Sequence, residues 1–460
     1  MKKFSILFLI LVAVLSAVPG VVGTRAASHY QRMIDQIKAS GIEVVSHRFH
    51  QGWFSSEAET QFALVVPKVE GAAKSASGIQ RFSLISRINH GPLTESGAGL
   101  AEIDSRLQLD GEPLFPTDYP ALIRTFVAFD GAAKTQLDLP PADVASDGKR
   151  PQVRFHGVKG ELESDAALSR IDLHLSSPGM VLLKEGVEQL NLSDFRVDSH
   201  TQQGVGGLML GNAVIGVERV EAVDSESGKR VKLEGLGFEA KSGADGGDVT
   251  MAISYHFDLA LFDEKRYGPG SLRIAIEKLP AQVLVNMQQA LSDIRRQQLT
   301  SMERQVAVMG ALMGSGQAVM ENHPKLVIDS LRLQTPEGLV EGRFSIQPVG
   351  LELTDVNDLM TLLSKLVAEV SLKMPESIYR TLFSHQLELQ LKQQLEEGEQ
   401  LPDDSEWQAR LAAAVDRQLG RLLQQGVLVR TGDQLVTEAS LSDSLLTVNG
   451  KMIPLPVATP

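Results

Sequence analysis

The sequence predicts an α+β protein that is mainly β: long antiparallel twisted sheets, amphipathic helices inserted in the C-terminal half, and one hydrophobic helix at the N-terminus. Apolar and polar residues alternate strictly from Val249 to Leu261. Shorter alternating segments, separated by turn sequences, recur over much of the chain. Between Pro280 and Met320 the apolar period changes to three and four residues, which is typical of helices.

The longest alternating stretch is the candidate functional surface. Alternation places its apolar side chains on one face of a strand that would run roughly 40 Å if unbroken. This face is our candidate for binding an apolar ligand, and its residues are Val249, Met251, Ile253, Tyr255, Phe257, Leu259 and Leu261.

The N-terminus predicts export. Lys2 and Lys3 precede an uncharged run over residues 4–23, which at about 20 residues is long enough to span a bilayer. The positive flank stays cytoplasmic, so the remaining chain is expected in the periplasm. Residues 1–27 are therefore a retained inner-membrane anchor or a signal peptide, and small residues allow cleavage after Gly23, Ala26 or Ala27.

Composition excludes several functions. The net charge of −13 argues against binding nucleic acid through its phosphates. The chain has no cysteine, which excludes disulfides, thiolate metal sites and cysteine nucleophiles.

Residues 28–140 are expected to form a short helix, over 28–40, followed by strands. The stretch Phe49-His50-Gln51-Gly52-Trp53-Phe54-Ser55-Ser56, the turn His90-Gly91-Pro92 and the terminal Leu446-Thr447-Val448-Asn449-Gly450-Lys451 resemble the YdgA-like family of Gram-negative bacteria, a domain of unknown function. The resemblance implies an exported, membrane-associated envelope protein rich in β-structure. It supplies no catalytic residues.

The next region, 141–279, is expected to be antiparallel β. The apolar pattern weakens between Pro113 and Pro151, which predicts a loop-rich connection before it. Strands then resume, and the segment from Val249 to Ile276 predicts a β-hairpin around the turn Tyr267-Gly268-Pro269-Gly270.

The last region, 280–460, is expected to mix helices and strands, and all three regions could form one continuous unit. One long amphipathic helix, or two, follows Pro280, and its methionines at 287, 302, 309, 313 and 320 are expected to face a core, with an adaptable binding surface as the alternative. Further helices are expected from Thr354, over 377–397 and after Pro402, with a closing hairpin or meander from Val427 to Val448.

The sequence assigns no catalytic residue, cofactor or metal ligand. His47 and His50 are three apart and would face opposite sides of a strand, which makes them poor joint ligands. No hydrolase or metalloprotease motif is present. A catalytic site assembled from distant residues leaves a hydrolase as a remote alternative.

Two functions and one simpler alternative follow. A non-enzymatic envelope protein could bind a lipid or acyl chain along its aliphatic sheet face. A membrane-anchored scaffold could instead bind other envelope proteins through its helices and sheet edges. The simpler alternative is an ordinary core, in which Val283, Met287, Leu291 and Ile294 cover the aliphatic face.

Overall fold

The computed structural model describes residues 34, 43–52, 54–65, 79–109, 112–113, 123–144, 152–184, 186–223, 228–262, 264–297, 301–352, 355, 358–394 and 404–453. The predicted N-terminal anchor or signal lies outside these residues, as does the helix over 28–40 apart from Ile34, which is helical and buried. Within the described part of the chain, no helix is both long and apolar enough to cross a membrane.

The chain folds into two compact units that interleave along the sequence. Unit 1 comprises residues 1–228, 241–247 and 281–315, and unit 2 comprises residues 229–240, 248–280 and 316–460. Two elements contribute to both units, namely β16 (Arg230–Asp245) and α4 (Ser301–Glu321).

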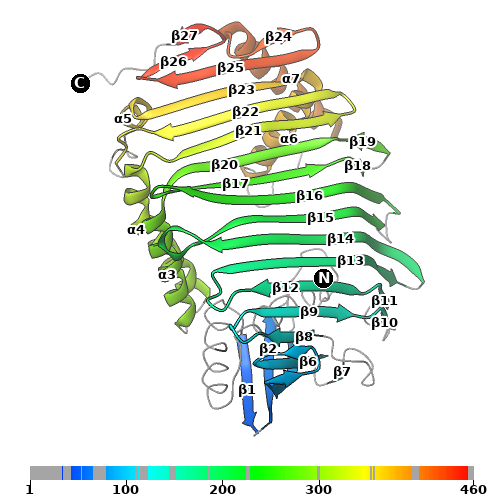
Figure 1. Ribbon diagram of the computed structural model, residues 1–460. Coiled ribbons are helices and arrows are strands. Elements are labelled where there is room, and N and C mark those ends of the chain that lie inside the picture. The colour runs from blue at the N-terminus through cyan, green and yellow to red at the C-terminus, as the bar shows by residue number, and fades with distance from the viewer. Residues whose placement is uncertain are drawn as a thin grey trace. The chain divides into compact units, whose positions relative to one another are not determined.

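Unit 1 is built mainly of strands (Figure 1). Its other elements are β1 (Glu43–Gln51), β2 (Ser55–Val65), β3 (Ile79–His90), β4 (Leu93–Thr94), β5 (Gly97–Ala98), β6 (Ala101–Leu109), β7 (Glu112–Pro113), β8 (Ile123–Val127), β9 (Ala133–Leu139), β10 (Ala142–Val144), β11 (Gln152–Phe155), β12 (Val158–Ser164), β13 (Arg170–Lys184), β14 (Val187–Gln203), the 3-10 turn η2 (Val205–Gly207), β15 (Met209–Val223) and α3 (Ala281–Arg296).

Antiparallel ladders join the main strands of unit 1 in the order β1, β2, β3, β6, β8, β9, β12, β13, β14 and β15. The inward side chains from β2 to β13 form one apolar core, in which Phe62 and Phe82 are cross-strand partners. Two polar pairs lie inside this core and satisfy each other: Ser86 and Ser105 are 2.8 Å apart, and Thr125 and Thr135 are 2.9 Å apart.

Unit 2 combines a second run of strands with three helices of its own. Its elements are β17 (Asp248–Phe257), β18 (Leu259–Phe262), β19 (Lys265–Tyr267), β20 (Gly270–Pro280), β21 (Lys325–Thr335), β22 (Gly338–Pro348), α5 (Leu359–Ser364), β23 (Leu366–Pro375), α6 (Glu376–Gln394), α7 (Asp404–Gln425), β24 (Val429–Thr431), β25 (Gln434–Ser442), β26 (Leu445–Val448) and β27 (Lys451–Ile453).

The ladders of unit 2 are also antiparallel and run in the order β17, β20, β21, β22, β23, β25, β26 and β27. The helix α6 contacts β23, β25 and α7, and Leu411, Val415 and Leu419 form a buried stripe on α7. Arg380 of α6 strengthens the contact between the two helices with an ion pair to Asp416 of α7, and it forms a second ion pair within α6 to Glu376.

The structure confirms a mainly β, antiparallel protein with helices inserted after residue 280. The hairpin between Val249 and Ile276 is confirmed in part: β17 pairs with β20, but a second pair, β18 with β19, is inserted between them, and the turn Tyr267-Gly268-Pro269-Gly270 joins β19 to β20. The loop-rich connection predicted between Pro113 and Pro151 is wrong in part, since β8 and β9 lie within it and belong to the core of unit 1.

Candidate apolar ligand face

The predicted ligand-binding residues lie on two strands instead of one. The strand that begins at Asp248 ends at Phe257, and a bend at Asp258 separates it from β18. The amide of Asp258 donates to the carbonyl of Glu234, and its carboxylate occupies the space beside Gly235, which has a positive φ of 63°. A single unbroken strand over Val249–Leu261 is therefore a wrong prediction.

The bend also ends the apolar surface. Beyond it, β18 pairs with the part of β16 that carries Lys232 and Glu234. These two side chains form an ion pair of 2.7 Å. In the ladder between β16 and β18, Lys232 stands opposite Leu261 and Glu234 stands opposite Leu259. The last two predicted residues consequently stand beside charges, and the continuous apolar surface stops at Phe257.

On the other side of β17 the apolar surface continues much further than the sequence suggested. The cross-strand pairs align apolar residues in rows across β17, β20, β21, β22, β23 and β25. We call these rows the apolar face of unit 2. The first row is Met251, Ile276, Leu326, Ile346, Ala368 and Leu441; the middle row is Ile253, Ile274, Ile328, Phe344, Val370 and Ala439; the third row is Tyr255, Leu272, Leu331, Gly342, Leu372 and Thr437.

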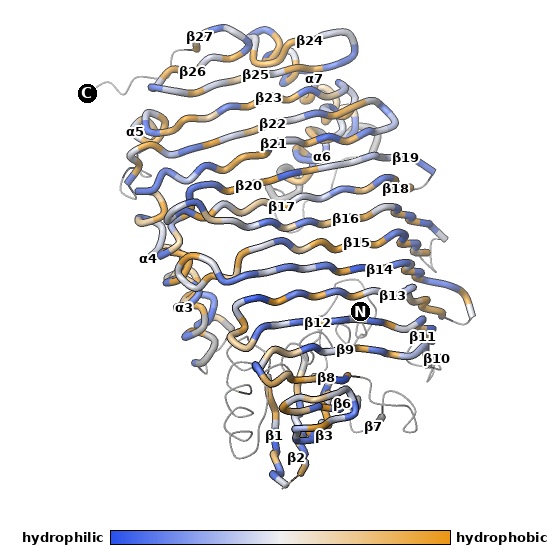
Figure 2. Tube along the Cα trace, viewed as in Figure 1, coloured by the Kyte–Doolittle hydropathy of each residue, from blue (hydrophilic) through white to orange (hydrophobic). Residues whose placement is uncertain are grey.

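Bulges keep these residues on the same face. The ladder between β21 and its neighbours shifts register between Ile328 and Leu331, two apolar residues that are three positions apart. In a regular strand that spacing would place their side chains on opposite faces. The inserted residues at Asp329–Ser330 form a bulge, which returns Leu331 to the apolar face. Figure 2 shows the resulting alternation of apolar and polar positions along β21, β22 and β23.

The apolar face of unit 2 remains partly open to solvent. Met251, Ile253 and Tyr255 are 43%, 36% and 46% exposed, and no member of the middle row is fully buried. In contrast, Phe62 and Phe82 in the covered core of unit 1 are 2% and 0% exposed. A sheet face covered by a second layer buries its central positions, so the middle row shows that the described residues do not cover this face completely.

One end of the face is closed. Leu333 pairs with Val340 and Met374 pairs with Leu435, and in these pairs Val340 and Leu435 are buried. This end adjoins the start of α6, which follows β23 directly (Figure 1). The helices of unit 2 therefore account for the burial at the end of the strands and leave the three rows half-buried.

The helix α3, which was predicted to cover the aliphatic face, has its described contacts in unit 1. Val283 and Ile294 of α3 are buried within unit 1, and Val285 lies against the 3-10 turn at Gly206. The predicted helix from Pro280 is in fact two helices, α3 and α4.

Three of the four methionines of α4 contradict the prediction that they face a core, whereas Met320 is half-buried. Met302, Val306, Met309 and Met313 lie on one side of the helix and are 77%, 67%, 54% and 67% exposed. We call these four residues the α4 methionine stripe.

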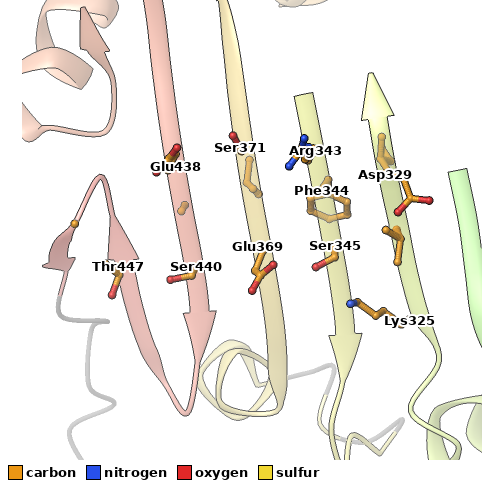
Figure 3. Close-up of a pocket in the computed structure, with 15 residues that line it drawn as sticks. Lys325, Asp329, Arg343, Phe344, Ser345, Glu369, Ser371, Glu438, Ser440 and Thr447 are labelled. Carbon is orange, nitrogen blue, oxygen red and sulfur yellow. The ribbon is translucent and has the colours of Figure 1, made fainter. Parts of the chain in front are cut away.

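The opposite face of the unit 2 sheet is polar and carries a shallow groove of about 640 Å³ (Figure 3). Lys325 and Arg343 lie toward one side of it, and Glu369 and Glu438 lie on the neighbouring strands β23 and β25. Ser345, Ser371 and Ser440 contribute hydroxyl groups on the same strands as these charges, and Thr447 adds one on β26. The two faces of one sheet thus differ sharply in polarity, which is typical of an antiparallel sheet with one solvated side.

Several ion pairs join neighbouring strands of unit 1. The carboxylate of Glu102 is fully buried, accepts a hydrogen bond from the amide of Ser96 at 2.8 Å and lies 3.2 Å from Nε of Arg124. A hydrogen bond to Asp104 is the main cause of the raised pKa of Arg124. The hydrogen bond from Lys134 is the main cause of the lowered pKa of Glu163. The Lys134 ammonium also forms an ion pair with Glu161.

A pair of histidines forms cross-strand contacts with aspartates on the exposed side of β13 and β14. His174 Nδ1 lies 2.7 Å from Asp198, and His200 contacts Asp172. The hydrogen bond to Asp198, followed by the attraction of its charge and those of Asp172 and Glu161, raises the pKa of His174.

We expect this contact to stabilise the protein more at low pH. The folded-state pKa of His174 lies above the unfolded value of about 6.5. The stabilisation is therefore fully present below that pH and is lost as the pH rises through the folded pKa. Urea unfolding at pH 5.5 and 8.0 should show a smaller loss of stability with rising pH in Asp198→Asn than in the wild type. An equal loss in both would contradict the assignment.

The histidines named in the sequence, His47, His50 and His90, lie on β1 and β3 of unit 1. His90 Nε2 lies 3.0 Å from the hydroxyl of Ser56, and His47 and His50 stand opposite Thr60 and Glu57 in the β1–β2 ladder. Among the described residues, no group of three or more histidines and carboxylates is arranged to hold a metal ion.

Comparison with known proteins gives one match. A family model described as "Bacterial protein of unknown function (DUF945)" matches residues 1–456. Neither the curated proteins nor the solved structures contain a significant match.

Proposed function

We propose that this chain, which belongs to the DUF945 family of bacterial proteins of unknown function, is a non-enzymatic envelope protein that binds a lipid or acyl chain along the apolar face of unit 2. The observation that carries the proposal is the half-buried middle row, whose side chains remain accessible on a sheet face that the described residues do not cover completely. An apolar surface of this kind gains free energy when a hydrocarbon removes it from water.

The proposed location follows from the sequence. The lysines at positions 2 and 3 and the uncharged run over residues 4–23 support export to the periplasm, with this run either retained in the inner membrane or removed. The YdgA-like, Gram-negative assignment belongs to the same proposal. A protein placed there would meet lipids directly.

Adjacent residues on β21 provide a matched test of binding. Ile328 lies in the middle row, whereas Val327 points to the polar face, and both are β-branched and half-buried. We expect Ile328→Asn to weaken binding of a fluorescent fatty acid by about tenfold or more, because the ligand must then cover an amide without a partner. Val327→Asn should leave the affinity nearly unchanged.

The measurement is a fluorescence titration of each purified full-length variant, with circular dichroism to confirm folding. Equal affinities for the two variants would argue against the apolar face as the binding site. No binding to the wild type, together with no lipid in its organic extract, would argue against the function itself.

A scaffold role is the second candidate, and the α4 methionine stripe favours it. Its four apolar side chains are all more than half exposed on one side of a helix. Methionine adapts to varied apolar partners, which suits a protein-binding surface. Crosslinking in intact cells tests this role: defined protein adducts through α4 support it, and the absence of any adduct counts against it.

A further inference from the structure

We infer that the ligand of the apolar face is an unbranched hydrocarbon chain that lies across the strands, at right angles to them. This inference rests on the proposed function and adds the shape and orientation of the ligand. Its basis is the register of the unit 2 ladders, which aligns apolar side chains from β17 to β25 without interruption in the first and middle rows, and with interruptions at Gly342 and Thr437 in the third.

The rows define two furrows. Residues of one face recur every second position, so neighbouring rows lie about 6.6 Å apart along the strands. Adjacent strands are about 4.8 Å apart, so the rows from β17 to β25 extend for about 24 Å. A flexible linear chain can lie in a furrow and follow the twist of the sheet, whereas a rigid polycyclic molecule contacts such a surface over a shorter length.

A peptide is a poor occupant of this face. Peptides that bind sheets usually add to a free edge through backbone hydrogen bonds. Here β20, β21, β22 and β23 are each paired on both sides, so their backbone groups are already used. The rows offer almost no other polar partner, since only Tyr255 and Thr437 carry hydroxyls, and that of Thr437 donates to the carbonyl of Val427 at 2.8 Å.

A folded protein partner is also disfavoured by area. Rows of about 24 Å with a total width of about 20 Å cover on the order of 500 Å². Stable protein interfaces bury about 800 Å² on each partner. A surface of this size and shape suits one or two hydrocarbon chains better than a protein.

The test is a series of saturated fatty acids of increasing length, measured by displacement of a fluorescent fatty acid from the full-length protein. Because the face is half-open, each added methylene should gain about half the free energy of a fully buried methylene. This gain corresponds to binding that is about twofold stronger for each methylene. The gain should stop once the chain exceeds the furrow. A polycyclic carboxylic acid with the same number of carbons should bind more weakly.

The variant Val370→Asn tests the orientation. Val370 lies in the middle row on β23, where an amide would shorten the path across the strands. We expect short chains to bind as in the wild type, while long chains lose their advantage. Glu369→Gln, on the opposite face of the same strand, is the matched control and should keep the full length dependence.

The outcomes are distinguishable. Affinity that is independent of chain length, equal binding of the polycyclic acid, or an equal effect of Val370→Asn on all lengths would overturn the inference while leaving the proposed function standing. A failure of every fatty acid to bind would overturn both.

Discussion

Replacing Phe82 with alanine is expected to lower the free energy of unfolding by about 3 to 5 kcal/mol. Phe82 is 0% exposed and faces Phe62 across the β2–β3 ladder, inside the core of unit 1. Removing its ring deletes a large apolar contact and leaves a cavity that the surrounding strands, fixed by ladders on both sides, fill only in part. Urea unfolding followed by circular dichroism measures the loss.

Phe54 provides the matched control because it is the same residue type at 81% exposure. Phe54→Ala should change the free energy of unfolding by less than about 0.5 kcal/mol. Equal effects of the two substitutions would show that the core of unit 1 is assigned to the wrong residues.

Replacing Arg124 with methionine is expected to cost about 3 kcal/mol, because it leaves the carboxylate of Glu102 buried without its cation. Only the amide of Ser96 would remain as a hydrogen-bond partner of that carboxylate. The estimate lies at the lower end for broken buried pairs, since the Arg124 side chain is 37% exposed and water can approach it. Chemical unfolding of the variant gives the value.

Two comparison variants separate the effect of the buried Glu102 charge from the effect of losing an arginine. Arg273→Met removes an ion pair of 3.0 Å with Asp329 in which both side chains are over 40% exposed, and should cost less than about 1 kcal/mol. Combining Arg124→Met with Glu102→Gln should recover part of the lost stability. If the two arginine variants were equally stable, burial of Glu102 would not be the cause.

The fold class and most elements were predictable because local patterns agree with the final structure. The alternation over β17 and β20 follows their pairing, and the change of period after Pro280 coincides with α3 and α4. The turn sequence Tyr267-Gly268-Pro269-Gly270 lies between two strands, β19 and β20.

The strands β8 and β9 were missed for a physical reason. Their inward positions include Thr125 and Thr135, which are 0% exposed and bond to each other through their hydroxyls. A threonine in a core position lowers the hydropathy of the pattern, although its pairing makes the position as buried as the neighbouring Ile123. Only the cross-strand hydrogen bond, which is seen in the structure, shows that these two threonines lie in the core.

The alternating apolar stretch was predicted, but its extent as one strand was not. The residues from Met251 to Tyr255 belong to the apolar face, yet the bend at Asp258 excludes Leu259 and Leu261. The rows across β20 to β25 depend on ladder register and on the bulge at Asp329–Ser330. Register is a property of paired strands, so one strand's sequence does not contain it.

The measurement that tests the central claim most directly is photo-crosslinking with a fatty acid that carries a diazirine near the end of its chain. After irradiation and digestion of the full-length protein, mass spectrometry locates the adducts. We predict adducts on residues of the three rows, in β20 to β23, that an excess of unlabelled fatty acid removes. Adducts confined to the α4 methionine stripe, or adducts that excess fatty acid fails to remove, would contradict binding at the apolar face of unit 2.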